Sequence, residues 1–124
     1  MLGALLLGAR VVTLPSPNPA RAFPAIAAEG VTITAVVPAV AQKWIEYQEE
    51  HRTDQLTTLQ VLQVGGSRMP DEVARKVKPV LGATLQQVFG MAEGLINMTR
   101  RDDPEEVICT TQGRPVSAAD EIRI

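Results

Sequence analysis

The sequence predicts an α/β protein with a mainly parallel sheet and crossover helices, and three observations lead to that prediction. Apolar runs of strand length alternate with stretches in which apolar residues recur at helical spacing. The run at residues 31–37 is almost continuously apolar and rich in β-branched residues, as is typical of a parallel strand buried on both faces. Glycine or proline follows the apolar runs, where strands are expected to end.

Residues 1–9 are apolar and allow two interpretations. A secretory leader would need a basic segment ahead of the apolar run, and this sequence has none. The run is also too short to span a bilayer. A buried helix end that leads into a strand is therefore favoured over a leader.

The first strand is expected at residues 11–14, where a cluster of prolines ends it. A helix follows, and it could begin at Asn18 and Pro19 or later at Pro24, since proline is tolerated in a first helical turn. Gly30 ends that helix under either interpretation.

The strand at residues 31–37 should be central in its sheet, and an amphipathic helix begins at Pro38. Its inner stripe consists of four residues at helical spacing: Val40, Ala41, Trp44 and Ile45. We interpret Trp44 and Tyr47 as packing residues. A polar loop at residues 51–58 then precedes a strand at residues 59–64.

A second crossover helix begins at Pro70, and Pro79 and Gly82 end it. Its inner stripe is Val73, Ala74 and Val77. The next strand covers residues 84–89. The chain is predicted to be loop-like after Arg100, with an acidic loop surface at residues 102–106, and residues 120–124 indicate the start of another strand.

Composition excludes several classes of function. The 124 residues are 45% hydrophobic with a formal net charge of −2, so they form at most one domain and offer no basic face to nucleic acid or to an anionic membrane. Cys109 and His51 are the only residues of their types, which excludes an internal disulfide and a His/Cys zinc cluster. Cys109 is expected to be buried and inert, and a reducing, cytoplasmic setting fits best.

Two glycine-containing segments stand at the carboxyl ends of predicted strands: Gly65-Gly66-Ser67-Arg68 and residues 88–94. In open α/β sheets, ligands bind at that edge. Glycine lets a ring or phosphate approach the backbone, Phe89 could stack on a base, and Glu93 offers a hard oxygen of the kind that Mg²⁺ prefers. Spacing alone favours ordinary turns and a solvated glutamate over a nucleotide site.

The amino-acid identities in these segments are more specific than their spacing. The string LQQVFGMAEGLINMTRRDDPEE from Leu85, with TQGRP from Thr111, closely resembles the aryl-acid branch of the acyl-adenylate-forming superfamily. LQVGG at residues 62–66 belongs to the same branch, and Ala92 stands where most of the superfamily has threonine. The string at residues 31–47 also fits, so the resemblance covers nearly the whole chain.

This resemblance implies a set of site residues. The implied nucleotide contacts are Gly65, Gly66, Val88, Phe89, Gly90, Met91 and Ala92. Among these, the Val88 carbonyl would accept a hydrogen bond from the adenine amino group, and Phe89 would stack on the base. Ser67 and Ile96 would border the aryl acid, and Glu93 would ligate Mg²⁺. Ile96 could equally be a core residue.

The resemblance also implies an activity. The parent enzyme would use ATP and Mg²⁺ to adenylate 2,3-dihydroxybenzoate or salicylate and would pass the acyl group to an aryl carrier protein of a nonribosomal peptide synthetase in siderophore biosynthesis. Residues 1–124 would be an internal fragment of its large N-terminal domain, without the phosphate loop or the C-terminal domain, and inactive alone. The alternatives are a related acyl-CoA ligase, which Ala92 disfavours, a non-catalytic nucleotide-binding module, or a non-functional fragment.

Overall fold

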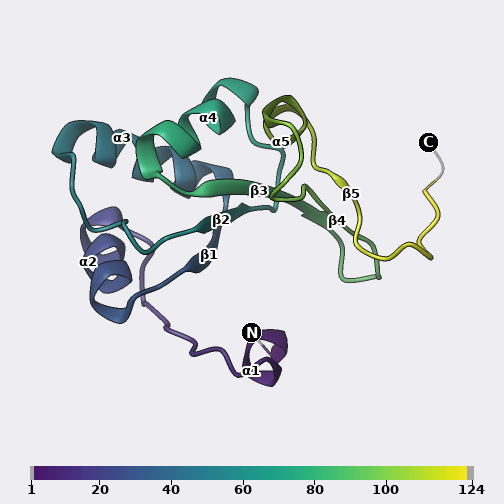
Figure 1. The fold of residues 1–124 in the computed structure, drawn as a ribbon, viewed down its shortest axis with the longest axis horizontal. Coiled ribbons are helices and arrows are strands. Elements are labelled where there is room, and N and C mark those ends of the chain that lie inside the picture. Colours follow the sequence, from purple (N-terminus) through teal and green to yellow (C-terminus); the bar gives the residue numbers. More distant parts are fainter. Residues whose placement is uncertain (1, 123–124) are drawn as a thin grey trace.

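A five-stranded sheet in the order β1-β2-β3-β4-β5 forms the centre of the computed structural model, which describes residues 2–122 (Figure 1). The strands are β1 (Ile33–Val36), β2 (Val61–Val64), β3 (Thr84–Gly90), β4 (Ile96–Met98) and β5 (Arg114–Pro115). The pairings β1–β2 and β2–β3 are parallel, whereas β3–β4 and β4–β5 are antiparallel. The α/β class is confirmed, and the predicted parallel strands carry an antiparallel extension.

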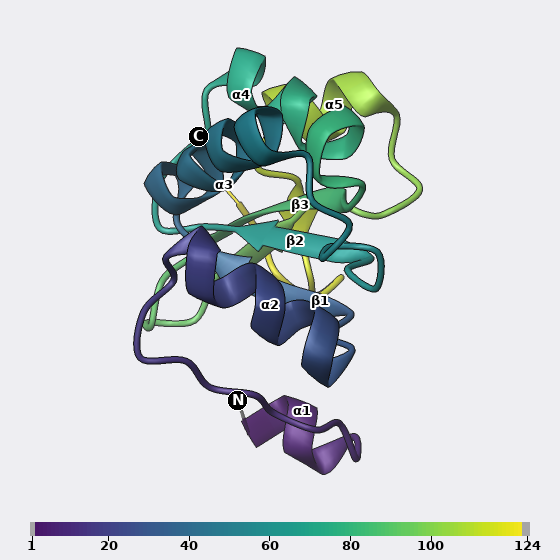
Figure 2. The same cartoon turned by 90° about the vertical axis from the view of Figure 1, so that its left-hand side faces the viewer.

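Helices cover one side of this sheet in both views (Figures 1 and 2). The helices are α1 (Leu2–Leu6), α2 (Pro19–Glu29), α3 (Pro38–His51), α4 (Asp71–Lys76) and α5 (Glu105–Thr110), and a π-helical turn, η1 (Val77–Leu81), continues α4. α3 connects β1 to β2, and α4 with η1 connects β2 to β3, so both are crossover helices. α3, α4 and α5 cover the same face. Among the described residues, no helix is long and apolar enough to cross a bilayer.

The core lies between the sheet and these helices and continues under α2. Leu62, Val64 and Leu85 point into it from the strands. Phe23 of α2 meets the rings of Trp44 and Tyr47 edge-on, with centroid separations of 5.3 Å and 5.4 Å. These contacts confirm that both α3 aromatics pack in the interior.

The start of α2 is settled by its cap. The Asn18 side chain accepts a hydrogen bond from the Ala20 backbone N–H at 3.0 Å, and Pro19 occupies the first turn, where a missing N–H costs nothing. Pro24 lies inside the helix. Gly30 ends α2 in the left-handed conformation at φ 62°, as predicted.

Three predictions for the N-terminal part are wrong. Residues 11–14 form no strand, because no neighbouring strand pairs with them within residues 2–122. β1 is an edge strand rather than a central one, and Ile33 is 52% exposed. α1 is not buried, since Leu6 and Leu7 are 87% and 88% exposed.

The C-terminal part also differs from the prediction. The acidic run at residues 102–106 is not wholly loop: Glu105 and Glu106 form the first turn of α5, where carboxylates complement the positive end of the helix dipole. Pro79 does not end its helix but lies within η1, which Gly82 terminates. Residues 120–122 are not in a strand, and residues 123–124 lie outside the described part of the chain.

Candidate functional site

The candidate site begins where the parallel strands end together. Gly65 follows β2, and its backbone N–H donates to the carbonyl of Val36, the last residue of β1, at 3.2 Å. A Cβ at Gly65 would lie 3.0 Å from the Val88 carbonyl oxygen and 3.4 Å from the Val88 Cβ. A side chain at Gly65 would crowd the Val88 backbone, so glycine favours this close approach of β2 and β3, and the two predicted segments do meet.

A hollow of about 540 Å³ lies at this corner, and we call it the strand-end hollow. Its lining residues are Pro17, Ala35, Val36, Val37, Val40, Gln63, Gly65, Gly66 and Val88. Three of them belong to the predicted site, namely Gly65, Gly66 and Val88. Gly66 has φ 88°, which glycine adopts without strain. An apolar concavity with few polar groups is the usual form of a small-molecule site.

Apart from Ser67, the remaining predicted residues lie on a hairpin that leaves this corner. Phe89 and Gly90 end β3 opposite Asn97 and Ile96 of β4. The turn between the strands is closed by a hydrogen bond from the Met91 N–H to the Leu95 carbonyl at 3.0 Å. The chain therefore bends at the sheet edge, as expected, and does not form a helix there.

The side chains of the hairpin are accessible. Phe89 is 38% exposed, Met91 47% and Ile96 46%, and Ala92 and Glu93 are also exposed. Ile96 is thus not a core residue in residues 2–122. None of these residues lines the strand-end hollow, and Ser67 lies exposed in the loop after Gly66.

Glu93 offers a single carboxylate. No group of three or more histidine, cysteine, aspartate or glutamate side chains is gathered as for a metal within the described residues. Mg²⁺ is commonly held by one or two protein carboxylates together with substrate phosphates. An exposed glutamate at a turn fits that use as one ligand of a metal that arrives with a nucleotide.

Comparison with known proteins defines the family. The AMP-binding enzyme family matches the chain over residues 1–124. The chain belongs to this family. Over all 124 residues it is 58% identical to 2,3-dihydroxybenzoate-AMP ligase of Bacillus subtilis, and it covers 23% of that protein. It is 54% identical to a Streptomyces protein named salicylyl-CoA synthase / salicylate adenylyltransferase. That match covers all of the chain and 22% of the relative.

The solved structures agree with the fold. The apo structure of MbtA from Mycobacterium smegmatis matches with a TM-score of 0.89 and 50% identity, over 99% of this chain and 22% of the other. The chain therefore spans less than a quarter of the length of these relatives. The glycine corner and the hairpin therefore lie in a part of the fold that the longer MbtA chain also contains.

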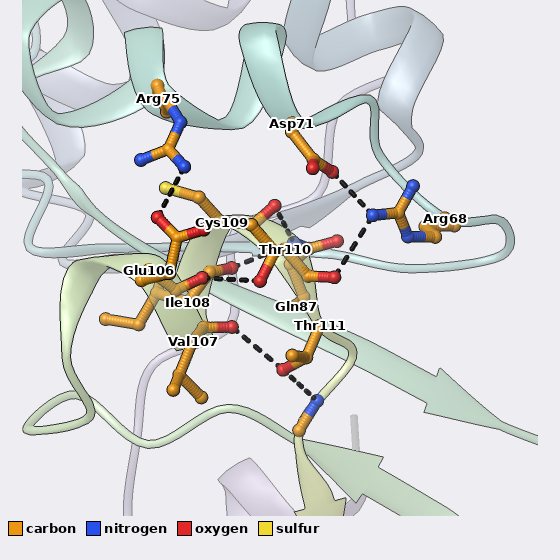
Figure 3. Close-up of polar contacts among 11 residues, drawn as sticks. Arg68, Asp71, Arg75, Gln87, Glu106, Val107, Ile108, Cys109, Thr110 and Thr111 are labelled. Carbon is orange, nitrogen blue, oxygen red and sulfur yellow. Dashed lines mark hydrogen bonds and ion pairs between the residues drawn. The ribbon is translucent and has the colours of Figure 1, made fainter.

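Beside the glycine corner, polar contacts hold α5 against the sheet and α4 (Figure 3). The last four carbonyls of a helix have no partner within it. In α5 all four are satisfied from outside. Thr111 donates to Val107, Gln87 donates to Ile108 at 2.8 Å and to Cys109 at 3.2 Å, and Arg68 donates to Thr110 at 3.1 Å.

Arg68 forms a local ion pair with Asp71 at 2.5 Å. Its second bond, to the Thr110 carbonyl, also ties the loop after Gly66 to α5. Arg75 and Glu106 form another pair between α4 and α5 at 2.5 Å. Hydrogen bonding to Glu106 raises the pKa of Arg75 above its ordinary value.

Cys109 lies in this layer, and its burial is confirmed at 3% exposure. Burial raises the pKa of its thiol above the ordinary value. Such a thiol is mainly protonated at neutral pH and is a poor nucleophile. Cys109 is therefore a packing residue.

Sequence reasoning missed three glutamines, Gln63, Gln86 and Gln87. Gln87 is 1% exposed, and its amide donates to carbonyls at the end of α5. Gln63 and Gln86 bond to each other at 2.8 Å on the opposite face of the sheet. The alternation of side chains along β2 and β3 could have assigned these glutamines to opposite faces of the sheet. It could not show which other residues each face contacts.

Proposed function

We propose that this chain is part of an enzyme that activates an aryl acid with ATP and transfers it to a thiol. The observation that carries the proposal is the glycine corner: Gly65 against Val88, beside an apolar hollow at the carboxyl ends of parallel strands. The 58% identity to 2,3-dihydroxybenzoate-AMP ligase supports an aryl acid as the substrate class.

In the proposed reaction, a carboxylate oxygen of the aryl acid attacks the α-phosphorus of ATP, and the bond to pyrophosphate breaks. A thiol sulfur then attacks the acyl carbonyl, and AMP leaves. Chemistry of this kind needs positioning and charge neutralisation more than covalent help from the protein. Bound Mg²⁺ would supply positive charge beside the phosphates, with Glu93 as one of its ligands.

The chain's own residues have positioning roles in this proposal. Gly65 and Gly66 would lie against the flat adenine, since neither carries a side chain that would keep a ring away. Phe89 would stack on the base, and the Val88 carbonyl would accept from its amino group. Ala92 and Gly90 would leave room for the α-phosphate, and Ser67 and Ile96 would border the aryl ring.

We propose an aryl carrier protein, acting in siderophore biosynthesis in the cytoplasm, as the thiol partner. Transfer to coenzyme A is the second candidate, because a relative that is 54% identical is named both a salicylyl-CoA synthase and an adenylyltransferase. Offering the full-length enzyme each thiol separately, with salicylate or 2,3-dihydroxybenzoate, distinguishes them. The thiol whose addition releases AMP from the enzyme-bound acyl adenylate is the acyl acceptor.

The test of adenylation is aryl-acid-dependent exchange of pyrophosphate into ATP by the full-length enzyme. Glu93→Ala should lower the exchange rate by about 100-fold, since a lost metal ligand costs at least as much as a lost outer-shell partner. Glu72→Ala, which removes an exposed carboxylate from the first turn of α4, is the matched control and should leave the rate unchanged.

Unchanged exchange in Glu93→Ala would remove Glu93 from the metal site, and an inactive wild type with every aryl acid would reject adenylation. The 124-residue chain alone should show no exchange, because the proposed phosphate loop and C-terminal domain belong to other parts of the enzyme.

A further inference from the structure

The hairpin formed by β3 and β4 depends on contacts at its base. Phe89, Met91 and Ile96 are each more than a third exposed, so their side chains add little packing near the turn. β4 contributes only the residues Ile96–Met98 to the pairing with β3. Contacts at the end of β4 are therefore needed to hold the hairpin in place beside the glycine corner.

Arg100 joins β4 to β5 at this base. Its Nη1 donates to the Met98 carbonyl at 2.7 Å, and its Nη2 donates to the Pro115 carbonyl at 2.9 Å. These two carbonyls belong to the last residues of β4 and β5. β5 is only two residues long and Pro115 has no N–H, so the backbone alone offers few bonds between the strands. The planar fork of the guanidinium can hold two acceptors at once.

Arg100 is itself held in position. Its backbone N–H donates to Asp103 Oδ2 at 2.6 Å, and Asp103 Oδ1 accepts from the side chain of Arg114, the first residue of β5, at 2.9 Å. The Asp103 side chain is only 9% exposed. The Arg100 side chain is also partly buried, and a hydrogen bond is stronger there than in water. Arg100 and Asp103 therefore link the end of β4 to both residues of β5.

This link is connected to the glycine corner through β4. Met98 lies directly opposite Val88 in the β3–β4 pairing, and Val88 is the residue that Gly65 approaches at the corner. The next pairs toward the turn are Phe89 with Asn97 and Gly90 with Ile96. A displacement of Met98 would therefore move Val88 and the whole hairpin beyond it.

We infer that Arg100 is a positioning residue for ATP, because by joining Met98 to Pro115 it holds Val88 and the hairpin in the geometry that receives the adenine. This inference rests on the proposed function, which places the adenine beside Val88 and Phe89. Arg100 does not touch the nucleotide in this role, and it acts through the backbone of Met98. Its removal should therefore weaken ATP binding by folded enzyme.

The test measures the KM for ATP in pyrophosphate exchange by the full-length enzyme at saturating aryl acid. Arg100→Met removes the guanidinium and should raise this KM by about fivefold to tenfold, within the range for coupling through a bonded network. Arg100→Lys keeps the charge without the planar fork, so it should recover only part of the affinity. Arg101→Met, at the exposed neighbouring position, is the matched control and should behave like the wild type. Calorimetric titration with ATP and Mg²⁺ measures the same change without turnover.

A purely structural role of Arg100 would give a different result. It would lower the melting temperature and, through loss of folded enzyme, the maximal rate, but it would leave the KM for ATP unchanged. Gly30→Ala is the control for this pattern, since Gly30 ends α2, which lies beside β1 at the other end of the sheet from β4 (Figure 1).

An unchanged KM for ATP in Arg100→Met, or complete recovery in Arg100→Lys, would overturn the role of Arg100. If Arg100→Met does not fold, Arg100→Lys decides the question by itself, because wild-type affinity for ATP in that variant contradicts a need for the fork. A wild type without aryl-acid-dependent exchange would instead reject the proposed function.

Discussion

At the scale of single residues, Gly113 has the tightest surroundings among the glycines whose side-chain environment the structure describes. It adopts φ +78°, and a Cβ there would lie 2.0 Å from the Met98 carbonyl carbon. Because that contact is with backbone, no rotamer change can relieve it. Gly113→Ala should lower the free energy of unfolding by about 4 kcal/mol or more, measured by urea denaturation of the full-length enzyme.

Gly30→Ala is the matched control for Gly113→Ala. Gly30 has a similar φ of +62°, but nothing lies within 4 Å of the position of its Cβ. It should cost only the left-handed backbone penalty of about 1–2 kcal/mol. Equal losses in the two variants would show that the contact with Met98 contributes nothing.

The sequence predicted part of the site at this scale. Glycine after a strand is a signal of close approach, so the meeting of Gly65 with the end of β3 could be expected from the pattern, whereas the role of Val88 came from the family resemblance alone. Gln63 could not be found, because a glutamine in an alternating strand is usually solvent-facing. Gln63 bonds to Gln86, and Gln86 bonds to the Thr99 carbonyl, and these contacts form only when β3 pairs with β2 and β4.

At the scale of elements, α5 depends on β3 through Gln87. Gln87→Met would leave the Ile108 and Cys109 carbonyls without their donors in a buried setting. The free energy of unfolding should fall by about 2–3 kcal/mol, the cost of two unsatisfied acceptors. Gln42→Met removes one exposed bond to Glu46 within α3 and should cost less than about 0.5 kcal/mol. Chemical denaturation with a circular-dichroism signal measures both.

The connection between β4 and α5 should depend on pH through Asp103. Its Oδ2 accepts from the Arg100 N–H at 2.6 Å and its Oδ1 accepts from Arg114 at 2.9 Å. The backbone bond to Arg100, and then Arg114, lower the pKa of this carboxyl in the folded state. Its stabilisation is therefore complete above the unfolded value of about 3.9 and is lost as the pH falls through the lower folded pKa.

Asp103→Asn should accordingly lower the urea midpoint at pH 7, and the difference from wild type should shrink as the pH falls below about 4. The exposed neighbour Asp102 provides the control, since Asp102→Asn should leave the midpoint unchanged at every pH. A difference for Asp103→Asn that stays constant down to pH 2.5 would contradict the assignment.

Long, strongly periodic elements were predictable, and short ones were not. α3 and β3 were found because their patterns extend over 14 and 7 residues. β4, with 3 residues, and β5, with 2, have too few positions to show a period. β1 was recognised as a strand but placed wrongly in the sheet. Apolar residues on both faces indicate that a strand can be buried on both sides, but they do not show its position in the strand order.

At the scale of the whole molecule, the apolar surface of the 124-residue chain predicts how it behaves alone. Leu6 at the end of α1, Leu7 directly after it and Ile33 on the edge strand β1 are all at least half exposed. Contiguous apolar surface and a free strand edge favour association between copies. The chain produced alone should therefore self-associate at micromolar concentration, as measured by sedimentation velocity.

Two double variants separate the sources of this association. Leu6→Ser with Leu7→Ser should shift the population toward monomer without changing the melting temperature, because these side chains contact little of the folded core. Ile33→Lys with Val37→Lys should do the same through β1, since charge on an edge strand opposes pairing between sheets. If both combinations leave the sedimentation profile unchanged, the association has another origin than the surfaces that α1 and β1 expose.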